Sequence, residues 1–232
     1  MTNHRDLMQF HVQALFTHDA DGDLVRVNEP HGPAAPRFFF GRTQHGSVLR
    51  FRHDVDAGIR RELEAAAAAD LVPGRPIDDS LDASRYAAIL ERSAPVGTIW
   101  AGSAFSFPQG FSDGRGTLRI TERNAGVLEL YFYEWIDDVP RCQPMAGIQV
   151  NGHVVSLCCS VRQTDLADEA GVETAQPYRG HDYARHVTTA WATAVREQNR
   201  VPLYSTSWAN APSRAVARKI GLLLIGSDLH LG

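Results

Sequence analysis

An Asn151-Gly152 dipeptide between two apolar runs is the feature that most constrains how this chain can fold. Asn and Gly accept the positive φ angles at both central positions of a type I′ turn, whose twist matches that of two antiparallel strands. We therefore predict a hairpin whose strands span residues 145–150 and 153–162. A fold with an antiparallel sheet in the second half of the chain follows from this hairpin.

The elements around this hairpin alternate between strands and helices. Helical periodicity, an N-cap Asp or Asn and a stop at Gly221 predict helices over 182–198 and 210–220. Thr121 has N-cap chemistry, and Val127 to Trp135 follow helical spacing, although their aromatic content keeps a strand as the alternative. Strands are predicted over residues 117–120, 169–174, 201–208 and 222–231, the last as one strand or two.

The N-terminal half is less regular. Asp-Gly within residues 19–23 predicts a hairpin that joins the apolar runs 10–16 and 24–27. A calcium loop would need Gly and Glu where Leu24 and Pro30 stand, and His4, His11 and His18 are too widely spaced for a metal site, so no metal is expected. Further elements are predicted as strands over 38–40, 47–51 and 98–107, a helix that Asp54 or Asp56 caps and that runs to Asp70, and a helix over 81–92.

A polar, Gly-rich break over residues 108–116 marks the predicted domain boundary. We predict an N-terminal α/β region over 1–114 and a C-terminal domain over 115–232. The fold class is α/β (α+β), with a mixed, mostly antiparallel central sheet that helices flank.

Composition excludes several classes of protein. The 232 residues are 44% hydrophobic, and 23 Lys and Arg against 27 Asp and Glu give 23 − 27 = −4, so neither disorder nor nucleic-acid binding is expected. The run Ala65–Ala69 is far too short to span a membrane, and the polar N-terminus predicts no signal peptide. Cys142, Cys158 and Cys159 form no disulfide framework, which favours reduced thiols, packing in the core and a cytoplasmic location.

Residues 171–184 are predicted as a strand, a tight turn and the start of a helix. The first N–H groups of a helix lack intrahelical partners and carry the positive end of the helix dipole. Such a turn can bind a phosphate group. It can equally be a plain connection between a strand and a helix, and the residues alone leave both interpretations open.

A second strand-to-helix junction lies over residues 204–213, and with it the order of elements resembles the GNAT superfamily of acyl-CoA-dependent N-acetyltransferases. The resemblance runs from about Thr117 to the C-terminus. It is carried by the family's phosphate turn at residues 179–184, where Arg179 and Ala184 fit the pattern. It is also carried by Asn210 and Ser213, with Gly221 eleven residues after the Asn.

The resemblance implies a site for acetyl-CoA. Its residues would be Val172 and Thr174 on the strand that pairs with the pantetheine arm, Asn210 and Ser213 beside the thioester, and the phosphate turn with Arg179, Gly180, His181, Asp182, Tyr183 and Ala184. An acceptor amine must be neutral to attack the thioester. Glu173, on the strand that would line the thioester, is the predicted base, while the alternative is an exposed strand residue or the partner of an Arg.

Two residues depart from the family's pattern. Asp182 stands where a Gly is usual, and its carboxylate would repel a pyrophosphate. Ala217 stands where many members place a Tyr as general acid, so the acid would be water or another group.

The predicted function is the transfer of an acetyl group from acetyl-CoA to a primary amine of a small molecule or peptide, in a ternary complex. The alternatives are a non-catalytic CoA-binding regulatory module, and a protein-interaction scaffold without cofactor. Residues 1–114 would wall the acceptor site or form a degenerate GNAT-like half. A homodimer is compatible with the sequence.

Overall fold

The computed structural model describes residues 3–72, 74–111 and 114–232, which form two compact units. Unit 1 comprises Met1–Phe105, Ser205–Ala211 and Leu224–Gly232, and unit 2 comprises Ser106–Tyr204 and Pro212–Leu223. Each unit therefore draws on both halves of the chain. The division at residues 114 and 115 stays a prediction about domains. Residues 112 and 113, within the predicted break, lie outside the described residues.

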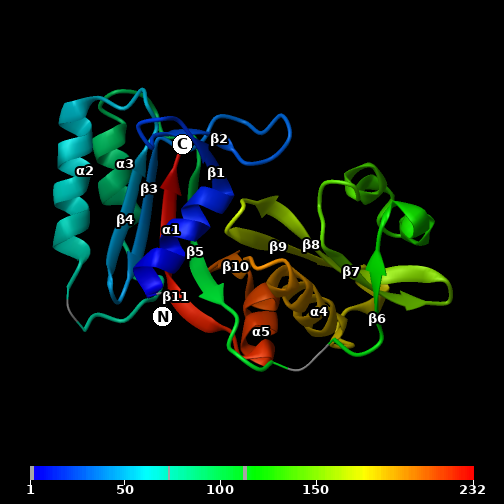
Figure 1. Ribbon diagram of the computed structural model, residues 1–232. Coiled ribbons are helices and arrows are strands. Elements are labelled where there is room, and N and C mark those ends of the chain that lie inside the picture. Colours follow the sequence, from blue (N-terminus) through cyan, green and yellow to red (C-terminus); the bar gives the residue numbers. More distant parts are fainter. Residues whose placement is uncertain (1–2, 73, 112–113) are drawn as a thin grey trace. The chain divides into compact units, whose positions relative to one another are not determined.

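Unit 1 is built on strands that follow the order β4-β3-β11-β5. Helices α2 and α3 cover one face of β3 and β4, and α1 lies on the opposite face (Figure 1). Its elements are α1 (His4–Leu15), β1 (Phe16–His18), β2 (Leu24–Val27), β3 (Phe38–Thr43), β4 (Gly46–Phe51), α2 (Ala57–Asp70), α3 (Ala83–Leu90), β5 (Ile99–Ser106, all but its last residue) and β11 (Leu223–Leu231, all but its first residue).

Helix α1 corrects the prediction that the first apolar run is a strand of a hairpin. Asn3 caps the helix by accepting from the Asp6 amide at 3.0 Å, while the Asp6 carboxylate accepts from the Asn3 amide. The buried residues Met8, His11, Val12 and Leu15 follow helical spacing. The hairpin forms, but its first strand is only Phe16–His18, paired antiparallel with β2.

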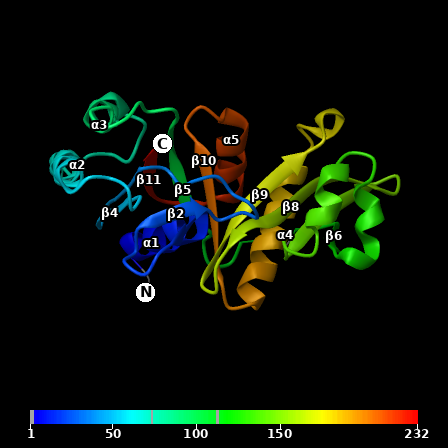
Figure 2. The same cartoon turned by 90° about the horizontal axis from the view of Figure 1, so that it is seen from above.

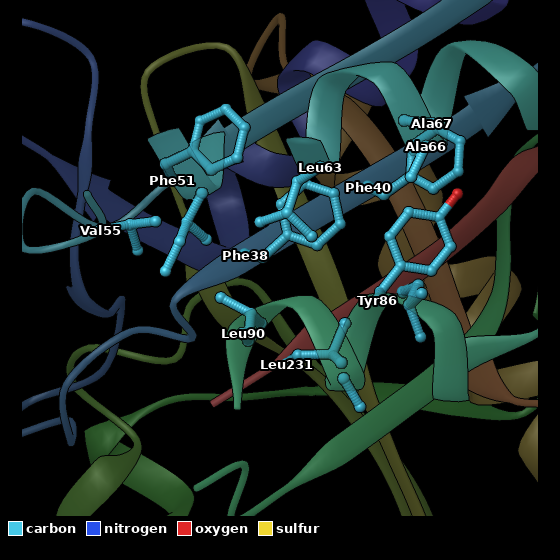
Figure 3. Close-up of a cluster of buried hydrophobic side chains, with 13 residues drawn as sticks. Phe38, Phe40, Phe51, Val55, Leu63, Ala66, Ala67, Tyr86, Leu90 and Leu231 are labelled. Carbon is cyan, nitrogen blue, oxygen red and sulfur yellow. The ribbon is translucent and has the colours of Figure 1, made fainter. Parts of the chain in front are cut away.

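The core of unit 1 lies between the sheet and the two helices α2 and α3. Aromatic rings from β3 and α3 stack in it, with ring centroids 5.6 Å apart for Phe38 and Tyr86 (Figure 3). The predicted helix to Asp70 is confirmed, and Asp56 rather than Asp54 is its cap. The strands over residues 38–40 and 47–51 and the helix over 81–92 are also confirmed, with shifted ends.

The opposite face of β11 carries a buried carboxylate between two histidines. The Asp228 Oδ2 atom lies 3.2 Å from His11 Nε2 and 2.7 Å from His230 Nε2. The His230 ring stacks on Trp100 with centroids 4.6 Å apart. Although burial opposes ionisation, the two imidazoles hold the pKa of Asp228 well below its usual range. This cluster ties α1 to the C-terminal strand.

Unit 2 contains the strand order β10-β9-β8-β7-β6. Helix α4 runs along β8 and β9 (Figure 2), and the two 3₁₀ segments η1 and η2 pack on a cluster of buried β7 and β8 side chains. Its elements are β6 (Thr117–Ile120), η1 (Glu122–Leu128), η2 (Tyr133–Asp138), β7 (Met145–Val150), β8 (His153–Gln163), β9 (Ala167–Thr174), η3 (Gln176–Tyr178), α4 (Tyr183–Glu197), β10 (Val201–Ser207, its first four residues) and α5 (Ala211–Ile220, all but its first residue).

The Asn151-Gly152 turn is confirmed. Asn151 has φ +50° and Gly152 has φ +86°, and β7 and β8 pair antiparallel on either side. The mixed, mostly antiparallel sheet flanked by helices is confirmed as the fold class, since β9 and β10 form a parallel pair and β6 to β9 are antiparallel. None of the described helices combines the length and apolarity needed to cross a membrane.

The segment after Thr121 differs from both predicted forms, helix and strand. It makes two short 3₁₀ helices, and Asn124 with φ −125° and ψ 15° breaks the first of them. Leu128 and Phe132 turn into the core of unit 2, where they are fully buried or nearly so. Aromatic and β-branched side chains have a low helix propensity, so a continuous α-helix is not strongly favoured here. The burial of Leu128 and Phe132 therefore determines the backbone conformation of this segment.

The Asp168 carboxylate at the start of β9 supplies a test of this core. Burial raises the pKa of Asp168 to about 6, although the Ser160 hydroxyl and Arg200 oppose the shift. Between about pH 4 and pH 6 the native state then binds more protons than the unfolded state, so the free energy of unfolding falls as pH rises. Asp168→Asn should remove about 2 kcal/mol of this fall.

The measurement is urea unfolding near pH 4.5 and near pH 7. Asp165→Asn, at an exposed carboxylate in the same β8–β9 connection, is the control and should keep the wild-type slope. An unchanged slope in Asp168→Asn would contradict the assignment.

Candidate functional site

Strands β9 and β10 pair in parallel only over their first three residues, and both continue beyond the paired part. The register joins Val201 with Ala167, and ends where Leu203 meets Glu169. On its other side β9 pairs with β8 as far as Thr174 opposite Ser156. For residues 170–174 the described chain shows no register with β10. Backbone groups on one edge of this stretch are therefore available to a ligand that lies alongside the strand.

A tight turn joins β9 to α4. The Arg179 Nε atom donates to the Thr174 carbonyl at 3.1 Å, which closes the turn onto the end of the strand. Gly180 has φ +84°, a conformation natural to glycine. The His181 Nδ1 atom lies 3.2 and 3.1 Å from the Tyr178 and Arg179 carbonyls, so the turn itself orients this exposed ring.

Asp182 precedes α4 in the left-handed region, with φ +65° and ψ 9°. Its side chain makes no capping hydrogen bond to the helix, and the first backbone bond of this end runs from His186 to the Asp182 carbonyl at 3.4 Å. In the described chain no acceptor is found for the amides of Tyr183 and Ala184. Uncapped amides at the positive end of a 15-residue helix suit an anion.

Two cations neutralise the Asp182 carboxylate. Arg185 Nε donates to Oδ2 at 2.5 Å and Lys219 Nζ to Oδ1 at 3.0 Å, while 33% of the Asp182 side chain is exposed. Partial desolvation raises the pKa of Asp182, but the hydrogen bonds from Arg185 and Lys219 outweigh it and lower the pKa. The expected repulsion of a phosphate is thus offset by one surplus positive charge among these three residues.

Glu173 lies on β9 with an exposed side chain. Its Oε2 atom accepts from the Trp135 indole N–H at 3.0 Å, so η2 fixes the carboxylate. On the same strand, Thr174 Oγ1 is 2.8 Å from Ser156 Oγ, and Val172 is half-buried. A carboxylate held by one neutral donor keeps lone pairs free to accept a proton from a ligand.

The predicted residues do not all fall in one unit. Val172 to Thr174, the turn over residues 179–184 and Ser213 belong to unit 2, whereas Asn210 belongs to unit 1. The Tyr204 hydroxyl bonds to Ser213 Oγ at 2.6 Å, and burial raises the pKa of Tyr204 to about 12. Ala217 is buried, so no side-chain donor replaces the usual tyrosine at this position.

The two neighbouring cysteines take no part in this arrangement. Cys158 and Cys159 are fully buried and free, as expected for core residues. Burial raises the pKa of the Cys158 thiol well above its ordinary value, which opposes a nucleophilic role. In the described part of the chain no three His, Cys, Asp or Glu side chains are grouped to hold a metal ion.

Sequence reasoning missed the partners that complete the site. Arg185 follows Asp182 at the i,i+3 spacing of ion pairs, so helix geometry could have identified it. Lys219 and Trp135 are distant in sequence from Asp182 and Glu173, and only the fold brings them together.

Comparison with known proteins agrees with this geometry. Residues 146–226 match the family model described as GNAT acetyltransferase. This segment contains the hairpin, β9, the turn, α4, β10 and α5. No curated protein matches the chain.

Solved structures similar to the chain include a candidate acetyltransferase from the GNAT family of Novosphingobium aromaticivorans, with a TM-score of 0.50 and 16% identity. The match covers 59% of this chain and 65% of that chain, just under two thirds of its length. A GCN5-related N-acetyltransferase-like protein from Streptococcus suis matches with a TM-score of 0.47 and 15% identity, over 84% of this chain and 82% of that one. At such identities the first structure supports the fold alone. The matched segment and the fold together show that the C-terminal half of the chain contains a GNAT-family domain.

Proposed function

We propose that this protein transfers an acetyl group from acetyl-CoA to a primary amine of a small molecule or peptide. The observation that carries the proposal is the uncapped N-terminus of α4, which follows a strand that is unpaired with β10 beyond Glu169. The segment that matches the GNAT family contains both features. The edge of β9 comes first and could pair with the amide-rich pantetheine arm, and the N-terminus of α4 follows it and could donate amides to a pyrophosphate.

In this proposal the chain binds acetyl-CoA mainly through its backbone. The amides of Gly180 to Ala184 would hold the pyrophosphate, with Arg179 and His181 beside it. Main-chain groups of Val172 to Thr174 would pair with the pantetheine arm, and Asn210 and Ser213 would lie near the thioester. When bound, acetyl-CoA supplies an acyl group activated as a thioester. A backbone N–H of the β9 edge would polarise its carbonyl.

Glu173 is the proposed base. A primary amine is mostly protonated at neutral pH and cannot attack a carbonyl until it loses a proton. The Glu173 carboxylate would take that proton directly or through a water, while Trp135 keeps it in place. Ala217 can donate no proton to the departing thiolate, so we propose that water does.

The runner-up is a non-catalytic CoA-binding regulatory module, and Ala217 is the observation that favours it. Both functions require acetyl-CoA to bind, which calorimetric titration measures. Release of free thiol from acetyl-CoA across a panel of primary amines separates them. Steady thiol release with one amine would establish the enzyme. Binding without release for any amine would favour the module, and absence of binding would reject both.

Asp182 provides a test that depends on binding alone. Asp182→Asn keeps a residue that tolerates the left-handed backbone and removes the negative charge, which frees Arg185 and Lys219. The Kd for acetyl-CoA should fall about fivefold at low salt, since a partly exposed charge of this kind is worth about 1 kcal/mol. The gain should shrink as salt is added.

Asp165→Asn removes another exposed charge from unit 2, at the far end of β9 in sequence, and should leave the Kd unchanged. Weaker binding by Asp182→Asn would contradict a phosphate at the α4 terminus.

The finer expectations belong to the same proposal. We propose a cytoplasmic location on the grounds that three cysteines stay free and buried. A homodimer and the role of residues 1–114 at the acceptor remain part of this hypothesis.

A further inference from the structure

The buried polar residues Arg42 and Ser227 lie next to the hydrophobic core of unit 1, on strands β3 and β11. In the antiparallel register of β3 and β11, Phe38 faces Leu231, Phe40 faces Leu229, and Arg42 faces Ser227. Side chains at every second position share a face, so Arg42 and Ser227 lie on the same face as the core cluster of α2 and α3. Directly opposed residues have Cβ atoms about 5 Å apart.

The Arg42 guanidinium is buried with most of its donors unused. Only 3% of its side chain is exposed, and among the described residues only its Nη2 atom has partners, the Asp78 carbonyl at 3.3 Å and the Asp78 carboxylate at 3.6 Å. Nε and Nη1 are buried, and residues 3–72, 74–111 and 114–232 offer them no hydrogen-bond acceptor. Leaving a buried charged donor unpaired is expensive. Arg37, another buried arginine next to the same strand, instead donates to the Leu90 and Pro95 carbonyls and to Ser93 Oγ.

Ser227 repeats this pattern at the facing position. Its side chain is buried, with 4% of the residue exposed, and in the described part of the chain its Oγ atom has no hydrogen-bond partner. Ser103 on the neighbouring strand β5 is buried too, but its hydroxyl donates to the Thr206 carbonyl at 3.3 Å. Two facing residues thus carry three donors that lack a partner among the described residues: Arg42 Nε, Arg42 Nη1 and Ser227 Oγ.

The ion pairs around Arg42 leave its Nε and Nη1 donors unused. Arg42 lies 3.6 Å from Asp78, while Arg75 and Arg85 lie 3.5 and 3.8 Å from Asp70. Arg85 also interacts with the Asp82 carboxylate, so three guanidinium groups face three carboxylates. Asp70 also accepts from the Tyr86 hydroxyl at 2.6 Å, at the margin of the aromatic cluster (Figure 3). The cluster therefore has hydrogen-bond donors to spare on Arg42.

We propose that unit 1 holds a small monovalent anion, either chloride or a carboxylate group, between Arg42 and Ser227. Such an anion accepts hydrogen bonds and donates none, so it suits the charged Arg42 donors and the Ser227 hydroxyl. Because Arg42 also binds the Asp78 carbonyl, the anion connects the sheet to the segment between α2 and α3. The proposal concerns unit 1 and does not rest on acetyl-CoA binding.

Thermal unfolding in HEPES buffer, with sodium chloride or sodium acetate added, tests the proposal. Either salt should raise the Tm of the wild type along a saturating curve, and the salt that does so identifies the class. Arg42→Met, which replaces the buried charge by an apolar chain of similar length, should abolish the saturating rise. Ser227→Ala should raise the half-maximal concentration at least about tenfold, as expected for a lost hydrogen bond to an ion.

Arg37→Met and Ser103→Ala are matched controls, because these buried residues have partners within the protein. Both should keep the wild-type salt curve whatever their Tm, since general salt effects act on all variants alike. A crystal soaked in sodium bromide should show an anomalous peak within hydrogen-bond reach of Arg42 Nε and Ser227 Oγ. Equal salt curves for the wild type and Arg42→Met, or water alone at this position, would overturn the proposal.

Discussion

Replacing Glu173 by glutamine should lower kcat for the amine acceptor by about 100-fold or more, with the Kd for acetyl-CoA unchanged. Glutamine has the size of glutamate, and its amide oxygen can still accept from Trp135, but it cannot take a proton from an ammonium group. The proposed contacts of β9 with the cofactor use main-chain atoms, so binding should survive. Single-turnover thiol release and calorimetric titration measure the two quantities separately.

Glu197→Gln, near the C-terminal end of α4, changes an exposed carboxylate outside the proposed site and serves as the control. Full turnover by Glu173→Gln with intact binding would remove Glu173 as the base. Loss of binding together with turnover would instead assign Glu173 to the cofactor site.

The largest effect on stability is expected in unit 1. Asp228→Asn should lower the free energy of unfolding by about 3 kcal/mol, because it breaks a fully buried pairing with His11 and a largely buried one with His230. The sign of the pH dependence follows from the lowered pKa of Asp228. The stabilisation is present above the unfolded carboxylate's pKa of about 4 and is lost as pH falls below it.

Urea unfolding followed by circular dichroism checks both expectations. The difference between wild type and Asp228→Asn should be full near pH 7 and should shrink below about pH 4. Asp21→Asn, at an exposed carboxylate between β1 and β2, should change stability by less than about 0.5 kcal/mol. A difference as small as this for Asp228→Asn would mean that the histidines find other partners.

Local rules predicted those elements whose signals lie within a few residues. The Asn151-Gly152 hairpin, the α2 cap at Asp56 and the stop of α5 at Gly221 depend on turn and cap chemistry that the neighbouring residues complete. Helix α1 was missed because its apolar spacing starts at Met8, while the run from Phe10 reads as a strand.

Long-range pairs could not be predicted. The seven-residue spacing of His4, His11 and His18 predicts no function for His11. Its structural role comes from its contact with Asp228, which lies 217 positions away. The turn before α4 could be located from its spacing, but the neutralisation of Asp182 by Lys219 depends on how α5 packs. Residue types and their spacing thus predict which groups could bind a phosphate at the turn. The charges that surround Asp182 depend on the tertiary fold.

The place of β11 has a consequence for synthesis on the ribosome. This strand lies between β3 and β5 in the sheet order, yet it is the last element of the described chain. While the first 105 residues emerge, the strands that β11 separates lack their common neighbour. The sheet of unit 1 can therefore close only after residues 223–231 have been made, and until then β3 keeps one edge open.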